Sequence, residues 1–187
     1  MKKIIPLFLF LLIALSSQAQ EKKAEVCDCP EPTKDEFTSV CQAIYDKEAY
    51  EGSGPFSYVY QENLWELSCV KPNESIEIAK IKIQCMWSKY RQNFRCFGYP
   101  DSIATDLNIL KFSLDTGFTA FISEAVKKYN LDMNFKDPAD NKTILDFIKD
   151  QIKIIGNSPP VDNAKITEYS RLYKMLQDQG AKHGKDL

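Results

Sequence analysis

The chain has 187 residues, of which 44% are hydrophobic and 27% are charged, and its formal net charge at pH 7 is −2. This length is enough for one domain with a sizeable core. The slightly acidic balance, with no basic cluster, argues against a nucleic-acid interface and against a cationic face for a membrane surface, so a protein partner fits the charge best.

The first 19 residues have the pattern of an export signal. Lys2 and Lys3 supply the positive start, residues 4–15 are almost wholly apolar, and Ser17-Gln18-Ala19 offers the small residues that a signal peptidase requires. The apolar run is too short to span a membrane comfortably, and no other run approaches its length. We therefore expect residues 1–19 to be removed and the remaining chain to enter the periplasm or the medium, without membrane insertion.

All the cysteines lie beyond this segment. In an oxidising compartment an even number of cysteines indicates disulfides, although six allow fifteen pairings. Three lie between positions 27 and 41 and three between 69 and 96, so complete pairing requires at least one bridge between the two groups. The cysteines are Cys27, Cys29, Cys41, Cys69, Cys85 and Cys96.

Two other uses of the cysteines fit less well. A zinc site needs gathered thiolates, but the sequence has no Cys-x-x-Cys pair, and the Cys27-x-Cys29 spacing is tighter than the usual metal knuckle. Cys27 also lies too far from the apolar run to be the lipid-bearing cysteine of a lipoprotein. We therefore expect no metal, no lipid anchor and no cofactor.

Residues 20–62 are predicted to form a cysteine-rich N-terminal cap. Thr33-Lys34-Asp35-Glu36 is a capping box, which predicts a helix from there to about Tyr50, with Gly52-Ser53-Gly54-Pro55 ending it. The helix would present one apolar face formed by Phe37, Val40, Cys41 and Ile44.

A polar residue followed by an apolar pair recurs along the rest of the chain. It occurs at Asn108-Ile109-Leu110 and at Thr143-Ile144-Leu145, 35 positions later, and an upstream copy stands at Asn63-Leu64-Trp65. A repeat of this period is typical of stacked helical hairpins. The pattern predicts an all-α fold in which nothing requires a β-sheet, with helices beginning at Asn63, Asn108 and Thr143 and further helices over residues 74–94, 118–129 and 164–179.

These repeats resemble the ankyrin repeat. Residues 125–134, Ala-Val-Lys-Lys-Tyr-Asn-Leu-Asp-Met-Asn, are similar to the end of an ankyrin outer helix and its Gly-Ala-Asp-Val-Asn turn, with Asn130 in place of glycine. Residues 137–143 resemble the hairpin tip Asp-x-x-Gly-x-Thr, with one extra residue and Asn141 at the turn. Asparagine is the non-glycine residue best suited to positive φ, so both replacements are compatible with the turns.

The resemblance implies about three degenerate repeats over residues 63–184, stacked as a solenoid on the disulfide-bonded N-terminal cap. No copy has the proline that follows the first polar residue in the family, and none has the family's histidine. An unrelated array of α-helical hairpins is the alternative.

Catalytic patterns are scarce. The only histidine, His183, lies near a C-terminus that we expect to be frayed, which leaves no Ser-His-Asp triad or Cys-His dyad inside the fold. Glycine-rich phosphate loops are also missing. Two carboxylate pairs, Asp137 with Asp140 and Asp146 with Asp150, are the remaining catalytic option. No residue stands out as a nucleophile, and we expect no enzymatic activity.

The ankyrin resemblance implies binding through hairpin tips and the exposed ends of the inner helices. We therefore expect a monomeric, exported protein-binding module, such as an immunity protein that neutralises a toxin acting in the periplasm. An accessory partner of a periplasmic enzyme is the alternative, followed by a small carboxylate-dependent hydrolase. By position, the binding residues would be Lys71, Asp115, Thr116, Pro138, Ala139, Asp140, Lys142, Lys149 and Asp150.

Overall fold

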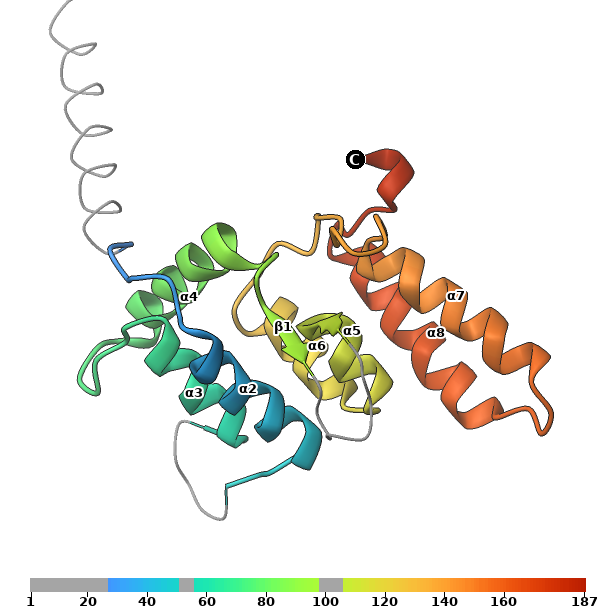
Figure 1. Ribbon diagram of the computed structural model, residues 1–187, viewed down its shortest axis with the longest axis horizontal. Helices are drawn as coiled ribbons and strands as arrows, with labels where there is room; N and C mark the ends of the chain where they lie inside the picture. The colour runs from blue at the N-terminus through green and yellow to red at the C-terminus, as the bar shows by residue number, and fades with distance from the viewer. Residues whose placement is uncertain (1–26, 51–55, 98–105) are drawn as a thin grey trace, which may run out of the picture.

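The computed structural model describes residues 27–50, 56–97 and 106–187, and this part of the chain is mainly helical (Figure 1). The predicted export signal and the predicted helix stop at residues 52–55 lie outside it. None of the helices in the described ranges is both long and apolar enough to cross a membrane. The elements are α2 (Lys34–Asp46), α3 (Val59–Leu67), α4 (Ile76–Tyr90), β1 (Arg95–Phe97), β2 (Asp106–Asn108), α5 (Ile109–Asp115), α6 (Thr119–Lys127), α7 (Ile144–Asn157), α8 (Asn163–Asp178) and the 3₁₀ helix η1 (Gly184–Asp186).

The predicted capping box at the start of α2 is confirmed. The hydroxyl of Thr33 accepts a hydrogen bond from the backbone N–H of Glu36, and the Glu36 carboxylate accepts one from the backbone N–H of Thr33 at 2.6 Å. The helix stops before Tyr50, its predicted end, because Lys47 adopts a left-handed conformation with φ of 54°. The predicted apolar face of Phe37, Val40, Cys41 and Ile44 is buried.

The predicted start of the next helix is wrong. Asn63 lies inside α3, which begins one turn earlier, where the Gln61 side chain accepts a hydrogen bond from the backbone N–H of Ser57 at 2.6 Å. The earlier start places Tyr60 on the buried face, and this gain in apolar contact outweighs a local capping pattern. Asn63 instead donates to the backbone carbonyl of Ser39 at 3.2 Å and links α3 to α2.

The helix predicted over residues 74–94 is shorter than expected and leads into a small sheet. Its last helical residue is Tyr90, and the chain then forms β1, which pairs antiparallel with β2 in a register that places Cys96 opposite Leu107. This two-stranded sheet is an addition to the mainly helical fold that the sequence predicted. Strands of three residues are too short to show an alternating pattern in the sequence.

The two C-terminal hairpins begin at the residues predicted to cap them. The side chain of Asn108 accepts a hydrogen bond from the backbone N–H of Leu110 at 3.0 Å at the start of α5. At the start of α7, Thr143 and Asp146 form a reciprocal capping box. The polar residues that recur at a 35-residue interval therefore both cap the start of a helix.

The turns expected to need positive φ also have it. Asn130 follows α6 with φ of 51°, and Asn141 closes the hairpin tip with φ of 58°. The expectation that asparagine adopts positive φ at these two turns is thus confirmed.

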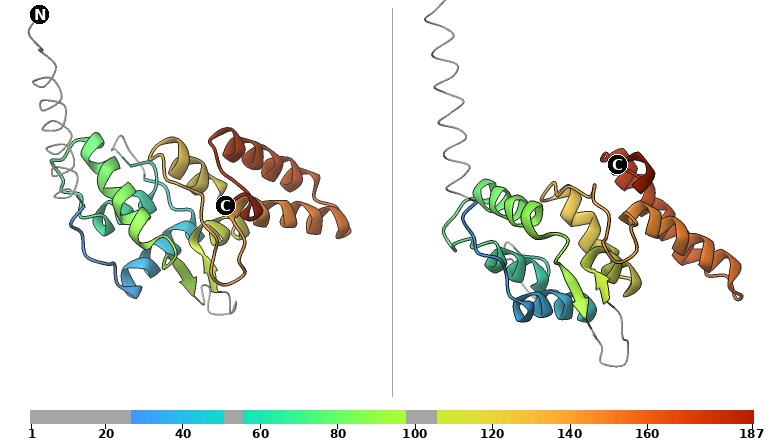
Figure 2. Two further views of the ribbon diagram at one scale, coloured as in Figure 1. Left: turned by 90° about the horizontal axis from the view of Figure 1, so that it is seen from above. Right: turned by 45° about the horizontal axis from the view of Figure 1, so that its top comes forward.

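The helices follow one another along the molecule (Figures 1 and 2). The α2–α4 group lies at one end, α5 and α6 lie in the middle, and the α7–α8 hairpin lies at the other end. Helix α5 packs against α7, and α6 packs against α8. One continuous cluster of buried side chains runs from Phe37 in α2 to Leu176 in α8, so the predicted N-terminal cap and the later helices share one core. The Tyr60 hydroxyl, which donates to Glu124 at 2.6 Å, joins α3 to α6.

All six cysteines form disulfides, and each bond joins the N-terminal group of cysteines to the later group. The pairs are Cys27–Cys85, Cys29–Cys69 and Cys41–Cys96. The prediction of at least one bridge between the groups is confirmed, and no thiolates remain for the alternative zinc site. Three disulfides indicate an oxidising environment outside the cytoplasm.

The disulfides differ in burial, and this difference gives a test. Cys41 and Cys96 are each 2% exposed, whereas Cys27 and Cys85 are half-buried. The three bonds close loops of similar length, so the entropic contributions should be alike, on the order of 2–4 kcal/mol. The Cys41→Ala/Cys96→Ala pair should lower the unfolding free energy more than Cys27→Ala/Cys85→Ala, by about 1–2 kcal/mol, because it also removes core contacts. Urea unfolding of the oxidised proteins measures the difference, and equal losses would contradict it.

Candidate functional site

Three of the predicted binding residues line an open groove between the hairpin tip and α7. Asp140 and Lys142 belong to the tip, and Asp150 lies on the facing side of α7. The groove has a volume of about 500 Å³. Pro138 and Ala139 are exposed in the same tip. The structure thus brings the predicted tip residues next to one exposed helix face.

The other predicted binding residues lie elsewhere. Lys149 is exposed on α7 but does not line the groove. Asp115 and Thr116 lie at the end of α5, and Lys71 lies in the turn between α3 and α4, in the other half of the molecule (Figure 1). The predicted surface is therefore divided, and only its tip and α7 part forms a continuous depression.

The sequence did not single out most of the residues on the α7 side of this groove. The lining on this side comprises residues of α7 and the residue that follows its end: Phe147, Gln151, Lys153, Ile154, Asn157 and Ser158. Phe147, Gln151 and Ile154 recur at helical spacing along one face of α7. Ile154 is 54% exposed, the highest value for a large hydrophobic residue in the described part of the chain. In the sequence, Phe147 and Ile154 belong to the ordinary apolar pattern of an amphipathic helix, so only the tertiary contacts reveal which of them stays uncovered.

The hairpin tip is built around Asp137. Its backbone N–H donates to the carbonyl of Lys142 at 3.0 Å, and its side chain accepts from the backbone N–H of Ala139 at 3.0 Å. The carboxylate of Asp140 accepts from the backbone N–H of Lys142 at 3.1 Å in the same way. Such aspartate turns, together with the positive φ of Asn141, define the shape of an otherwise exposed loop.

A buried lysine attaches this tip to the body of the protein. The ammonium of Lys111 in α5 donates to Asp137 at 2.7 Å and to Asp140 at 2.6 Å, and its side chain is only 3% exposed. Arg95 of β1 donates to the second oxygen of Asp137 at 2.6 Å and also pairs with Asp106 of β2. The tip is therefore held by charge-assisted hydrogen bonds from two different elements.

The Asp137 carboxylate is stabilised in its charged form. Burial alone would raise its pKa, but hydrogen bonds from Lys111, the backbone of Ala139 and Arg95 outweigh this effect and lower the pKa below the ordinary value. Phe147 of α7 lies beside the same lysine, with its ring centroid 5.5 Å from the ammonium. The aspartate thus serves as an internal counter-ion and is not presented to a partner.

The carboxylate pairs considered for catalysis have other partners. Asp137 and Asp140 do converge, but on Lys111. Asp146 and Asp150 lie one turn apart on α7 and bind different groups, since Asp150 pairs with Lys142 at 2.7 Å. Both acidic residues of the groove, Asp140 and Asp150, are therefore already held by lysines.

The prediction of a frayed C-terminus is wrong. The ring of His183 lies between Asp146, 2.7 Å from Nδ1, and the Tyr173 hydroxyl, 2.7 Å from Nε2. The backbone N–H of Gly184 donates to the same aspartate at 2.9 Å. These contacts fix the end of the chain on α7 and α8. A sequence window cannot show them, because the groups that bind His183 lie 10 and 37 positions away.

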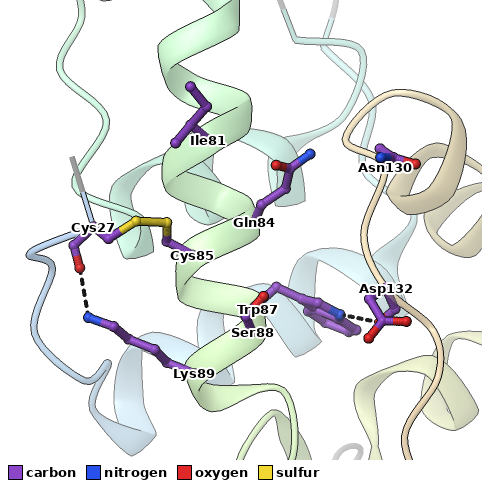
Figure 3. A pocket seen from close by; sticks show the side chains of 9 residues that line it. All are labelled: Cys27, Ile81, Gln84, Cys85, Trp87, Ser88, Lys89, Asn130 and Asp132. Carbon is purple, nitrogen blue, oxygen red and sulfur yellow. Dashed lines mark hydrogen bonds between the residues drawn. A yellow bond between two sulfur atoms is a disulfide. The ribbon is translucent and has the colours of Figure 1, made fainter. Parts of the chain in front are cut away.

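A second depression of about 390 Å³ lies beside α4 (Figure 3). Trp87 is one of the residues that line it, although this residue is almost fully buried. Its indole N–H donates to the backbone carbonyl of Asp132 at 2.7 Å, and Lys89 donates to the carbonyl of Cys27 at 2.7 Å. Gln84 is likewise bound to a backbone carbonyl, so much of the polar lining is occupied by the protein itself.

No group of three or more histidine, cysteine, aspartate or glutamate side chains is arranged to hold a metal ion within the described ranges. Comparison with protein-family models, with curated proteins and with solved structures finds no match to this chain.

Replacing Lys111 by methionine tests the attachment of the tip. The substitution leaves Asp137 buried with one cation fewer, which should lower the unfolding free energy by about 3 kcal/mol or more. The double variant Lys111→Met/Asp137→Asn should recover part of this loss, because it also removes the buried negative charge that Lys111→Met leaves short of a cation. Chemical denaturation measures both, and a loss below about 1 kcal/mol in the single variant would contradict the proposed attachment.

The C-terminal contact predicts a dependence on acid. Burial would raise the pKa of Asp146, but the backbone N–H of Gly184, the His183 ring and Thr143 lower it to about 2. Because the folded pKa lies below the ordinary value, the stabilising contribution should be complete above about pH 4 and be lost as the pH falls towards 2. Asp146→Asn should therefore be less stable than the wild type at pH 7, with a difference that shrinks in acid. A difference independent of pH would contradict the assignment.

Proposed function

We propose that this chain is an exported protein-binding module and that its contact surface is the groove formed by the hairpin tip and α7. The observation that carries the proposal is the attachment of an exposed loop to the core by buried Lys111. A loop whose shape is fixed before binding loses little conformational freedom when a partner arrives. The predicted leader and the three disulfides support export.

The order of elements supports an ankyrin-like arrangement. Helices α5 and α6 form one hairpin, residues 137–143 form a tip, and α7 and α8 form the next hairpin. The inner helices α5 and α7 pack on each other, as do the outer helices α6 and α8. We propose that α3 and α4 are a more distorted first unit, which gives about three repeats in total. In such a stack, the tip and the inner helix form the concave side.

The groove combines an apolar anchor with charges of both signs. Ile154 and Phe147 provide the apolar surface, and Asp140, Lys142 and Asp150 lie around it. Because Lys111 and Lys142 already neutralise the two aspartates, the groove is not strongly acidic. We propose a partner with an apolar protrusion flanked by polar groups.

Within this class, we propose the role of an immunity protein, which binds a toxin outside the cytoplasm one to one. A rigid, disulfide-bonded protein with a preformed groove suits stoichiometric inhibition. The acidic side chains of the groove are engaged by lysines, which favours binding over a carboxylate-dependent hydrolase.

The test is affinity capture from the protein's own strain. Immobilised, oxidised protein is incubated with periplasmic extract and secreted proteins, and the captured proteins are identified by mass spectrometry. A single stoichiometric partner supports the proposal, and assay of that partner with and without this protein separates an inhibitor from an accessory subunit. Absence of any partner at low salt would contradict a constitutive partner in that strain.

Ile154→Asp should abolish this capture. The substitution places a charge in the apolar centre of the groove, and the loss of an interface anchor typically weakens binding tenfold or more. Because Ile154 is exposed, the unfolding free energy should change by less than about 0.5 kcal/mol. Ile78→Asp on α4 is the matched control, since Ile78 is also exposed but lies outside the groove. Equal capture by the two variants would show that the contact surface lies elsewhere.

A further inference from the structure

A further groove, distinct from the two depressions described above, lies between α6 and α8. The proposed function does not use its surfaces. Its volume is about 510 Å³, and Leu172 and Met175 of α8 form its apolar floor. Both residues are largely covered by the protein, and the space above them is open. The depression therefore offers apolar contact to another molecule without requiring the fold to open.

The rims of this groove suit the approach of a helix. On α6, Thr119, Ser123 and Lys127 recur at intervals of four residues, and on α8 the lining runs from Ala164 to Met175. Small side chains such as Ser123 and Ala164 allow a third helix to come close to both rims. The lining of α8 spans 11 residue steps, which corresponds to about three turns of a helical partner.

The charges of the groove indicate the chemistry of that helix. Lys127 from α6 and Arg171 from α8 are exposed, and neither has an ion pair or side-chain hydrogen bond within the described residues. The only acidic residue of the lining, Glu168, accepts a hydrogen bond from the Thr119 hydroxyl at 2.5 Å. The groove thus carries a net positive charge, although the whole chain has a formal charge of −2.

We propose that the α6–α8 groove binds an acidic, amphipathic helical segment of a protein partner. The apolar side of that helix would cover Leu172 and Met175, and its carboxylates would pair with Lys127 and Arg171. This is a helix-in-groove contact, with affinity from apolar burial and orientation from the charges. It is independent of the tip and α7 groove, so the protein would have two separate contact surfaces.

The probe is a pair of synthetic, helix-stapled peptides of 16 residues. One has leucines along one face and glutamates on the others, and its twin has lysine in place of every glutamate. Titration into ¹⁵N-labelled oxidised protein should show that the acidic peptide shifts amide resonances of α6 and α8, whereas the basic peptide does not. Absence of shifts with millimolar acidic peptide, or equal shifts with both peptides, would overturn the proposal.

Charge reversal makes the test specific. Lys127→Glu/Arg171→Glu should weaken binding of the acidic peptide by roughly tenfold or more and create binding of the basic peptide. Lys80→Glu/Lys185→Glu changes the net charge by the same amount outside the groove and should retain the wild-type preference. Ile154→Asp should leave peptide binding unchanged, which separates this contact from the tip and α7 groove. Circular dichroism checks that each variant is folded.

Two other occupants have distinct signatures. If inorganic phosphate alone reproduced the shifts of the acidic peptide, the groove would be an anion site and the proposal would be overturned. Sedimentation velocity of the peptide-free protein over a range of concentrations tests for a second copy in the groove. A dimer that Lys127→Glu/Arg171→Glu abolishes would also overturn the proposal, because the groove would then be a self-association surface.

Discussion

A buried ion pair between Lys111 and Asp137 holds together the parts of the molecule on which the candidate site depends. A buried, unpaired ammonium or carboxylate would cost several kcal/mol, so each group requires the other. Asp137 also forms an ion pair with Arg95 of the sheet, and Lys111 forms a second ion pair with Asp140 of the tip. Helix α5, the β1–β2 sheet and the hairpin tip are therefore joined through one cluster of charges. A loop that would otherwise be only a connection becomes a surface of defined shape.

The two halves of the protein achieve their order by different means. In the N-terminal half, three disulfides connect α2 and the segment before it with α4, β1 and the turn after α3. In the C-terminal half, within residues 106–187, no cysteine occurs, and helical hairpins pack on each other with their ends fixed by hydrogen bonds. The contacts of His183 with Asp146 and Tyr173 attach the C-terminal segment to α7 and α8. The single core is thus stabilised by disulfides at its N-terminal end and by hydrogen bonds at its C-terminal end.

The hairpin tip and the α6–α8 groove differ in how their charged side chains are paired. Around the tip, the carboxylates are matched by lysines of the same chain, which leaves an apolar anchor as the main exposed feature. In the α6–α8 groove, two cations have no such match within the described residues. The first surface is suited to recognition by shape, and the second to recognition by charge. A net charge taken over the whole chain hides this difference.

The sequence by itself determined the features that depend on neighbouring residues. The capping boxes at Thr33 and Thr143, the cap at Asn108 and the positive φ of Asn130 and Asn141 were all predictable, because each is decided by contacts within a few positions. The division of the cysteines also required a bond between the two groups, since three residues cannot pair among themselves.

Only the tertiary structure decided the features that join distant residues. The start of α3 depends on the burial of Tyr60. The short sheet is held by the Cys41–Cys96 disulfide and by the ion pair between Arg95 and Asp106. His183 is fixed by groups on two helices. The candidate site shows the same division, because Asp140 and Lys142 were predicted from the tip pattern, whereas the exposure of Ile154 was not. Burial and ion pairing are properties of a packed environment, and a local pattern of residue types does not contain that environment.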